Sequence, residues 1–293
     1  CWLSAECPVF VAPAMDLEMY RNAATHRNLE ILRSRGVRTI GPEEGELASG
    51  LIGEGRMTEP EAITLHLIDE VIGRSPLAGK RVLITAGPTH EAIDPVRFIG
   101  NRSSGKMGFA LAEEAAARGA HVELITGPVE LTSRHPRIHR TDVTSAAEMA
   151  EAAKEHFPDT TIAILSAAVA DWRPAHVSDI KMKKQDKISA LELEPTEDIL
   201  AWMGGKKQAQ LLVGFALETS NEVRNAEGKL EKKNLDLIVL NSLNDPGAGF
   251  GYDTNKVTLI DTDKNATEVP LSSKADVAIA ILDRIEKLLT HAK

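Results

Sequence analysis

The sequence has few aromatic residues and few cysteines. Aromatic residues make up 4% of the 293 positions, so aliphatic side chains and alanine must fill most of any core. The two cysteines are Cys1 and Cys7. Two cysteines are too few for a disulfide framework, and chains from reducing compartments rarely keep a disulfide. We therefore expect a cytoplasmic protein.

Long apolar runs and a basic leader are also missing. No apolar stretch approaches the ~20 residues that span a bilayer. The start of the chain carries Glu6 and Asp16 and no basic residue, unlike a signal peptide. It also begins abruptly and without methionine, so we expect a piece of a longer chain. The net charge of −9 argues against general nucleic-acid binding, which favours a basic surface. It still permits a small anionic ligand, because the binding of such a ligand depends on local charge.

A stretch with Gly, Ser and Pro, GRSPLAGK, predicts a domain boundary. It follows an apolar-periodic helix candidate, EAITLHLIDEVI. We expect residues 1–73 to form one domain, residues 74–80 a linker and residues 81–293 a second domain. The first part is small for an independent core, and its first strand, in PVFVAPAM, has no visible partner upstream. A helix is expected from about Leu17 to Arg35, and a second strand in VRTIG.

Strand and helix patterns alternate after the boundary. Strands are expected in RVLITAG, HVELITG, IHRTDV, TIAILSAAVAD, LLVGFALE and LDLIVLN, with KVTLID as a late edge strand. Helices are expected over Lys106–Arg118, about Ser145–Phe157 and about Lys274–Leu289, and a charged helix before LDLIVLN. This order predicts an α/β fold with a doubly wound, mainly parallel, Rossmann-like sheet. Ligands of such sheets bind beyond the carboxyl ends of the strands.

The first candidate loop is TAGPTHEAIDPVRFIGNRSSGKMG, residues 85–108. Ser103, Ser104 and Gly105 stand directly before a helix, where backbone N–H groups and the helix field favour a phosphate. Lys106 adds positive charge, and Asn101 can hydrogen-bond an amide or a carboxylate. An ordinary capped junction between loop and helix has the same pattern, which is neither a Walker loop nor a clean GxGxxG.

The second candidate loop is SAAVADWRP, residues 166–174. Asp171 follows a buried strand and can hold Mg²⁺, for which carboxylates are preferred ligands, or a ribose hydroxyl. The backbone of Ala167 and Ala168 can read the edge of a base. The alternative is an aspartate that caps a turn at the end of the strand.

Two lysine clusters stand out in an acidic chain. DIKMKKQDK, residues 179–187, holds four lysines, and the second cluster is Lys229, Lys232 and Lys233. Lys229 and Lys233 are four residues apart and share one helix face. Two such clusters suit a triphosphate and a leaving pyrophosphate. A solvated charged face is the alternative for each cluster.

Taken together, five segments resemble phosphopantothenate–cysteine ligase. These segments are ITAGPTHEAIDPVRFIGNRSSGKMG, AAVADWRP, KMKKQ, VGFALET and KKNLDLIVLN, and the likeness covers residues 79–293. In bacteria this ligase is fused behind a flavin-dependent decarboxylase. The resemblance implies that CTP transfers CMP to the carboxylate of 4′-phosphopantothenate and releases pyrophosphate. The amine of L-cysteine then displaces CMP. It also implies a homodimer in which each subunit helps to cover its partner's site.

The resemblance also implies roles for individual residues. Asn101 recognises phosphopantothenate and serves the second half-reaction, and Lys181 is the catalytic lysine of a mobile flap. Ala167, Ala168 and Asp171 form the nucleotide and Mg²⁺ site. The other residues implied to contact the nucleotide are Glu197, Asp198, Ile199, Leu200, Phe215, Lys229 and Lys233.

The front of the chain resembles the C-terminal part of the flavodoxin-like, FMN-dependent decarboxylase. The likeness rests on PAMDLEMY, residues 13–20, and ELASGLIGEGRMTEP, residues 46–60. Asp16 stands where the family has a substrate-recognising asparagine, and Ser49 where it has a reactive cysteine. A hydroxyl does not replace a thiolate, and an ionised aspartate only accepts hydrogen bonds. We therefore expect no decarboxylation by this chain as given, and FMN only in an intact decarboxylase domain.

Two alternatives remain open. Doubly wound sheets often bind dinucleotides, so a nicotinamide-dependent oxidoreductase is one of them. The absence of a glycine fingerprint after RVLITAG counts against it. The second alternative, for residues 1–72, is a non-catalytic remnant or an assembly module.

Overall fold

A computed structural model describes residues 5, 7–72, 75–183, 190–218, 221–242, 249 and 251–291. The chain divides into two compact units, Cys1–Arg74 and Ser75–Lys293, which are described separately below. In the described ranges no helix has both the length and the apolar character needed to cross a membrane.

The first unit is a small α/β assembly. Two short parallel strands, β1 (Phe10–Val11) and β2 (Arg38–Thr39), pair with each other, and β3 (Glu43–Glu46) and β4 (Ile52–Arg56) form an antiparallel hairpin. The helices are α1 (Leu17–Arg21), α2 (Ala23–Ser34) and α3 (Pro60–Ile72). The single helix expected over Leu17–Arg35 is wrong. Asn22 has an extended backbone, and its side chain accepts a hydrogen bond from the N–H of Ala24, so it ends α1 and caps α2.

An eight-stranded sheet organises the second unit. Its order is β16-β15-β14-β13-β10-β5-β8-β9, and the strands from β14 to β9 run parallel. The bounds are β5 (Arg81–Ala86), β8 (His121–Thr126), β9 (Ile138–Asp142), β10 (Ile162–Leu165), β13 (Leu211–Glu218), β14 (Leu237–Ser242), β15 (Thr254–Asp261) and β16 (Ala266–Ser273). The prediction of a doubly wound, mainly parallel sheet is confirmed.

The expected edge strand KVTLID is internal. It belongs to β15, which pairs antiparallel with β14 on one side and with β16 on the other. The true edge, β16, has the sequence ATEVPLSS and is largely exposed, so it carries no apolar run that would mark it in the sequence. Pro270 lies in this strand, as suits an edge, because proline cannot donate to a strand ladder.

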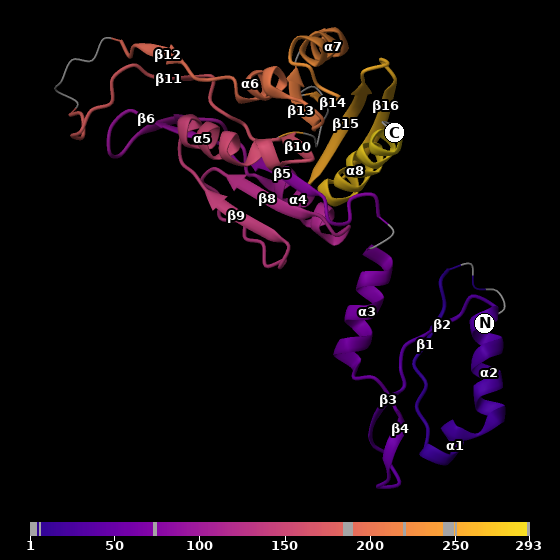
Figure 1. Ribbon diagram of the computed structural model, residues 1–293. Coiled ribbons are helices and arrows are strands. Elements are labelled where there is room, and N and C mark those ends of the chain that lie inside the picture. The colour runs from indigo at the N-terminus through magenta and orange to yellow at the C-terminus, as the bar shows by residue number, and fades with distance from the viewer. Residues whose placement is uncertain are drawn as a thin grey trace. The chain divides into compact units, whose positions relative to one another are not determined.

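Helices cover both faces of the sheet (Figure 1). The helices α4 (Lys106–Ala117) and α8 (Lys274–His291) pack on one face, and α5 (Ala146–His156), α6 (Ile199–Lys206) and α7 (Glu222–Lys232) pack on the other. Successive side chains of a strand point to opposite faces. Val82 and Ile84 of β5 accordingly join the core under α4 and α8, whereas Leu83 joins the other core.

Two short antiparallel ribbons extend from the loops of this sheet. One pairs β6 (His90–Ala92) with β7 (Phe98–Gly100), and the other pairs β11 (Trp172–Pro174) with β12 (Leu193–Pro195). Figure 1 shows β11, β12 and β6 reaching away from the large sheet. We call residues 90–100 and 172–195, as far as they are described, the arm. Each of its strands has three residues, which is too short for a periodic sequence pattern to mark it as a strand.

Candidate active site

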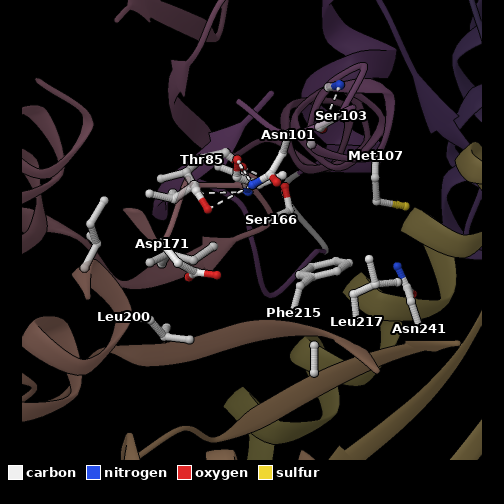
Figure 2. A pocket seen from close by; sticks show the side chains of 18 of the residues that line it. Thr85, Asn101, Ser103, Met107, Ser166, Asp171, Leu200, Phe215, Leu217 and Asn241 are labelled. Carbon is white, nitrogen blue, oxygen red and sulfur yellow. Dashed lines mark hydrogen bonds between the residues drawn. The ribbon is translucent and has the colours of Figure 1, made fainter. Parts of the chain in front are cut away.

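A cavity of about 610 Å³ opens at the carboxyl ends of the parallel strands. Its wall includes Thr85 at the end of β5, Ser166 after β10, Phe215 in β13 and Asn241 in β14. Figure 2 shows these side chains converging on one space. Strand β5 lies between β8 and β10, so the chain order switches beside it. The cavity therefore occupies the place where doubly wound sheets bind ligands, and its volume is usual for a small-molecule site.

The first turn of α4 approaches the sheet closely because of two glycines. Gly105, the N-cap residue, has a left-handed backbone with φ of 77°. A Cβ on Gly108 would lie 2.5 Å from the Cβ of Ala86 and 3.0 Å from its Cα. Ser103, Ser104 and Lys106 line the cavity beside this turn. The free N–H groups of a helix N-terminus favour an anion at such a place.

Asn101 joins the two candidate loops. Its side-chain Nδ2 donates to the carbonyl oxygens of Ala168 and Val169, both at 3.0 Å. The N–H of Ala168 donates in turn to the carbonyl oxygen of Gly87 at 2.9 Å. These bonds use both hydrogens of the Asn101 amide, so this side chain has its Oδ1 acceptor left to offer a ligand.

Two lysines of the second cluster reach the cavity from α7 and its C-cap. The Lys229 ammonium lies 2.7 Å from a carboxylate oxygen of Glu218, and the Lys233 ammonium lies 2.7 Å from one of Asp198. Asp198 also caps α6 by accepting from the N–H of Ala201. Burial raises the pKa of Asp198, but the Lys233 ammonium and this N–H outweigh burial and lower it overall. Thr196, Glu197, Ile199 and Leu200 line the same side.

Asp171 also lines the cavity, at the start of the arm. Its carboxylate is exposed, and in Figure 2 it lies on the same side of the cavity as Leu200, with Phe215 between this side and Asn241. Among the residues that the structure describes, no group of three or more His, Cys, Asp and Glu side chains is arranged to hold a metal. A single carboxylate still suits a Mg²⁺ ion that arrives with phosphates, because water molecules and substrate phosphates provide most of the ligands of such an ion.

Lys181 lies apart from the other candidates. It is exposed on the arm and does not line the cavity. The N–H of the next residue, Met182, donates to Asp94 Oδ2 at 3.1 Å, and the carbonyl oxygen of Met182 accepts from Arg97 at 2.7 Å. Asp94 is buried and ion-paired with Arg97. Lys184 and Lys187 of the same cluster lie outside the described residues. Of the described lysines in the two clusters, Lys229 and Lys233 line this cavity, whereas Lys181 and Lys183 do not.

Four polar cavity residues outside the two candidate loops were not predicted from the sequence. They are Thr196, Asn241, Asn255 and Lys274. Asn241 lies at the carboxyl end of the predicted strand LDLIVLN. Because ligands of such sheets bind at the carboxyl ends of strands, this position could have predicted Asn241 as a site residue. Lys274 is the first residue of α8 and is 8% exposed. A lone lysine at a helix start carries no such signal.

In the first unit the two decarboxylase-like motifs lie together. The N–H of Met15 donates to the carbonyl oxygen of Gly55 at 2.9 Å, and a Cβ on Gly55 would lie 2.2 Å from Met15 O. Asp16 caps α1 by accepting from the N–H of Leu17 at 2.6 Å. Ser49 is exposed in the turn of the β3–β4 hairpin.

Comparison with known proteins identifies both units. Residues 77–289 match the family described as DNA/pantothenate metabolism flavoprotein C-terminal domain, and residues 1–73 match the family described as flavoprotein. The solved structure of the C-terminal domain of a coenzyme A biosynthesis bifunctional protein CoaBC is similar, with a TM-score of 0.63 and 43% identity. The match covers 73% of this chain and 97% of that one.

Curated relatives match nearly the whole chain, and two of them are described here. A protein from an unknown prokaryotic organism, named cysteine/cysteine sulfinic acid decarboxylase, is 55% identical over 99% of this chain and 81% of its own length. The coenzyme A biosynthesis bifunctional protein CoaBC of Bacillus subtilis (strain 168) is 49% identical over 98% of this chain and 71% of its own length. The resemblance seen in the sequence is confirmed: the chain belongs to the family of the coenzyme A biosynthesis bifunctional protein CoaBC and carries its DNA/pantothenate metabolism flavoprotein C-terminal domain.

Proposed function

We propose that the second unit joins 4′-phosphopantothenate to L-cysteine in coenzyme A biosynthesis and consumes CTP. One observation carries the proposal: a single cavity at the switch point of the sheet collects Asn101, the Ser103–Lys106 turn, Asp171 and the Lys229/Lys233 pair. Family membership supplies the reaction, because the CoaBC relatives are named for coenzyme A biosynthesis. We also propose the domain limits 1–73 and 81–293, with residues 74–80 as the linker, and a cytoplasmic location.

In the first half-reaction a carboxylate oxygen of phosphopantothenate attacks the α-phosphorus of CTP. The bond from this phosphorus to the bridging oxygen of the β-phosphate breaks, and pyrophosphate leaves with the electron pair. Lys229 and Lys233, now paired with Glu218 and Asp198, stabilise the charge on the leaving group. The backbone of Ala167 and Ala168 reads the base. Mg²⁺ held by Asp171 would shield the phosphate charges.

In the second half-reaction the amine of cysteine attacks the acyl carbon of the acyl-cytidylate. A C–N bond forms, the bond from the acyl carbon to the phosphate oxygen breaks, and CMP leaves with the electron pair while the amine loses a proton. The free Oδ1 of Asn101 is suited to accept a hydrogen bond from this amine, because both amide hydrogens are held by Ala168 and Val169.

We further propose that the arm packs against a second copy of the chain. Its apolar side chains are unusually exposed, with Phe98 at 53%, Trp172 at 53%, Val177 at 56% and Ile180 at 77%. Contiguous exposed apolar surface marks interaction sites. In the resembled family each subunit helps to cover its partner's site, and an arm that carries Lys181 away from its own cavity suits this arrangement.

Product analysis tests the ligation. The protein is incubated with CTP, Mg²⁺, 4′-phosphopantothenate and cysteine, with one component left out in turn. We expect pyrophosphate and an acyl-cytidylate without cysteine, and CMP plus the amide when cysteine is added. An absence of both the acyl-cytidylate and the amide from the complete mixture would rule the proposal out.

The residues of the first unit do not fit the family's flavin chemistry. Ser49 offers a hydroxyl in place of a thiol, and Asp16 offers a carboxylate in place of an amide. We propose FMN only for an intact decarboxylase domain.

A second candidate function concerns that decarboxylase domain. The relative with 55% identity is named for cysteine and cysteine sulfinic acid, which are free amino acids. The Asp16 carboxylate, at the start of α1, can accept hydrogen bonds from an ammonium group, whereas an asparagine amide can also donate to a carboxylate. We propose that a longer protein containing this chain releases CO₂ from a free amino acid of this kind. Measured CO₂ release should be faster with cysteine or its sulfinate than with 4′-phosphopantothenoylcysteine, and the reverse order would exclude this function.

A further inference from the structure

The turn between β12 and α6 brings two adjacent carboxylates to the cavity. Its residues Thr196, Glu197 and Asp198 all line the cavity. The nucleotide proposed for this cavity carries several negative charges, and like charges at close range oppose binding. The partners of these two carboxylates therefore matter for any anionic ligand.

The two carboxylates have lysine partners on different elements. Asp198 Oδ2 lies 2.7 Å from the ammonium of Lys233, a lysine of the cavity wall. Glu197 Oε2 lies 2.6 Å from the ammonium of Lys154, which belongs to the last turn of α5 and does not line the cavity. The Glu197 carboxylate is thus held toward α5 by a partner outside the cavity.

A second group also holds Lys154. Its ammonium lies over the ring of Trp202, 5.4 Å from the ring centroid, as in a cation–π contact. Trp202 belongs to α6 and packs edge-on against Phe157, the C-cap residue of α5, with ring centroids 6.1 Å apart. An ion pair between freely mobile surface side chains contributes little. This ammonium is instead fixed between a carboxylate and an aromatic face.

The backbone of the turn is held independently of this ion pair. The N–H of Thr196 donates to the carbonyl oxygen of Asp171 at 3.0 Å, and its hydroxyl donates to that of Ala170 at 2.6 Å. On the other side of Glu197, Asp198 caps α6. Loss of Lys154 would therefore leave the turn in place and release only the Glu197 carboxylate, which could then rotate toward the cavity.

We propose that Lys154 is a positioning residue for nucleotide binding, which holds the Glu197 carboxylate against α5 and so keeps its negative charge away from the triphosphate. The inference rests on the proposed function, because it assumes that a nucleoside triphosphate binds beside Lys233. Charges act over a Debye length of about 8 Å at physiological ionic strength. The Cα atoms of Glu197 and Asp198, as neighbours in the chain, are about 3.8 Å apart. A released Glu197 carboxylate would therefore act on a phosphate bound at Lys233.

A double-mutant cycle separates this role from a structural one. The Kd of CTP is measured by titration calorimetry with Mg²⁺ and without the acid substrate, for the wild type, Lys154→Gln, Glu197→Gln and the double variant. We expect Lys154→Gln to raise the Kd roughly 3- to 10-fold, as one added like charge near the phosphates would. In the Glu197→Gln background the same change should alter the Kd by less than about twofold, because no carboxylate is left to release.

The charge of the ligand provides a second readout. CMP carries less negative charge than CTP, so Lys154→Gln should weaken the binding of CMP less than that of CTP. The deficit for CTP should also shrink as the salt concentration rises from about 50 mM to about 500 mM, because salt screens the repulsion. A displaced turn would instead weaken the binding of both nucleotides alike at every salt concentration.

Lys264→Gln is the matched control. It removes the same charge and breaks a lysine–carboxylate contact of 3.1 Å with Glu231, and neither residue lines the cavity. The Kd of CTP should stay within about twofold of the wild type, because the lost charge belongs to an exposed pair. Lys154→Arg, which keeps the charge, should retain most of the wild-type affinity.

Equal losses in the wild-type and Glu197→Gln backgrounds would overturn the inference, because Lys154 would then act on the fold and not through Glu197. If Lys154→Gln does not fold, Lys154→Met, which keeps an unbranched side chain beside Trp202, carries the same cycle. The cycle needs no turnover. An absence of amide formation would therefore contradict the proposed ligation alone, whereas a CTP affinity that Lys154→Gln leaves unchanged would contradict this inference alone.

Discussion

The side chain of Asn101 donates to the carbonyl oxygen of Ala168 at 3.0 Å and thereby links the loop after β7 to the loop after β10. The same amide reaches Val169 at the same distance. One residue thus fixes the geometry between the turn that begins α4 and the loop that leads to Asp171. In the proposed reaction this link would let one side chain act on both the acid substrate and the nucleotide.

Asn101→Asp should allow activation and impair the second half-reaction. An ionised aspartate cannot donate to the two carbonyl oxygens and is repelled by them, so its acceptor oxygen would no longer be held where the amine of cysteine attacks. We expect the acyl-cytidylate to accumulate, as detected by mass spectrometry after rapid quenching. Asn234→Asp is a matched control, since Asn234 donates to Gly204 away from the cavity. Unchanged progress from CTP to amide in Asn101→Asp would remove the assigned role.

Lys233→Gln should weaken CTP binding. Its ammonium lies in the cavity wall beside Asp198, and loss of a charge-assisted hydrogen bond to phosphate costs roughly 10- to 100-fold in affinity. Lys232→Gln is the control, because Lys232 neighbours it in sequence and does not line this cavity. The KM for CTP should rise for the first variant and stay within about twofold for the second. Equal effects would mean that only overall charge matters.

Lys181→Gln should slow activation and leave the fold intact. Lys181 is exposed, so its replacement removes no packing. Single-turnover pyrophosphate release should slow by at least tenfold, while the thermal unfolding midpoint should stay within a degree or two. In mixed dimers, a Lys181→Gln subunit should impair the site of a wild-type partner if the arm serves that partner. Wild-type turnover by the pure variant would show that the flap lysine is misassigned.

Asp94 should make stability depend on pH at the acid end. Burial raises its pKa, but hydrogen bonds from Val96, Arg97 and Met182 outweigh burial and hold the pKa well below its usual value near 3.8. A group with a depressed pKa in the folded state stabilises the protein above its unfolded pKa and loses this effect as the pH falls. Asp94→Asn should therefore be less stable than the wild type at pH 6, as measured by denaturant unfolding. The difference should shrink below about pH 4, and a difference independent of pH would contradict this account.

The large sheet was predictable because its strands are long and apolar. The runs RVLITA and LLVGFALE are buried on both faces and read as strands without any tertiary information. The arm was not predictable, since each of its strands has three residues and its pairing is decided by tertiary contacts. The helix break at Asn22 depends on a local cap that competes with helix propensity.

The sequence predicted those cavity residues that lie in or near a segment recognised as a strand or as the loop that follows it. Asn101, Ala167, Asp171 and Phe215 all line the cavity, although their roles stay predictions. Lys274 was missed because it lies about 170 positions beyond Lys106 in the chain, and only the packing of α4 beside α8 brings the two together. Lys181 was placed with the other lysines by charge and by the family resemblance, and neither reveals that the arm carries it away from this cavity.

Pyrophosphate release with CTP and with ATP, in the presence of 4′-phosphopantothenate and without cysteine, tests the central claim most directly. The account predicts release with CTP, much slower release with ATP, and none with either nucleotide when 4′-phosphopantothenate is omitted. It also predicts that added cysteine converts the activated acid to the amide. Pyrophosphate release that does not depend on 4′-phosphopantothenate, or no release with CTP, would contradict it.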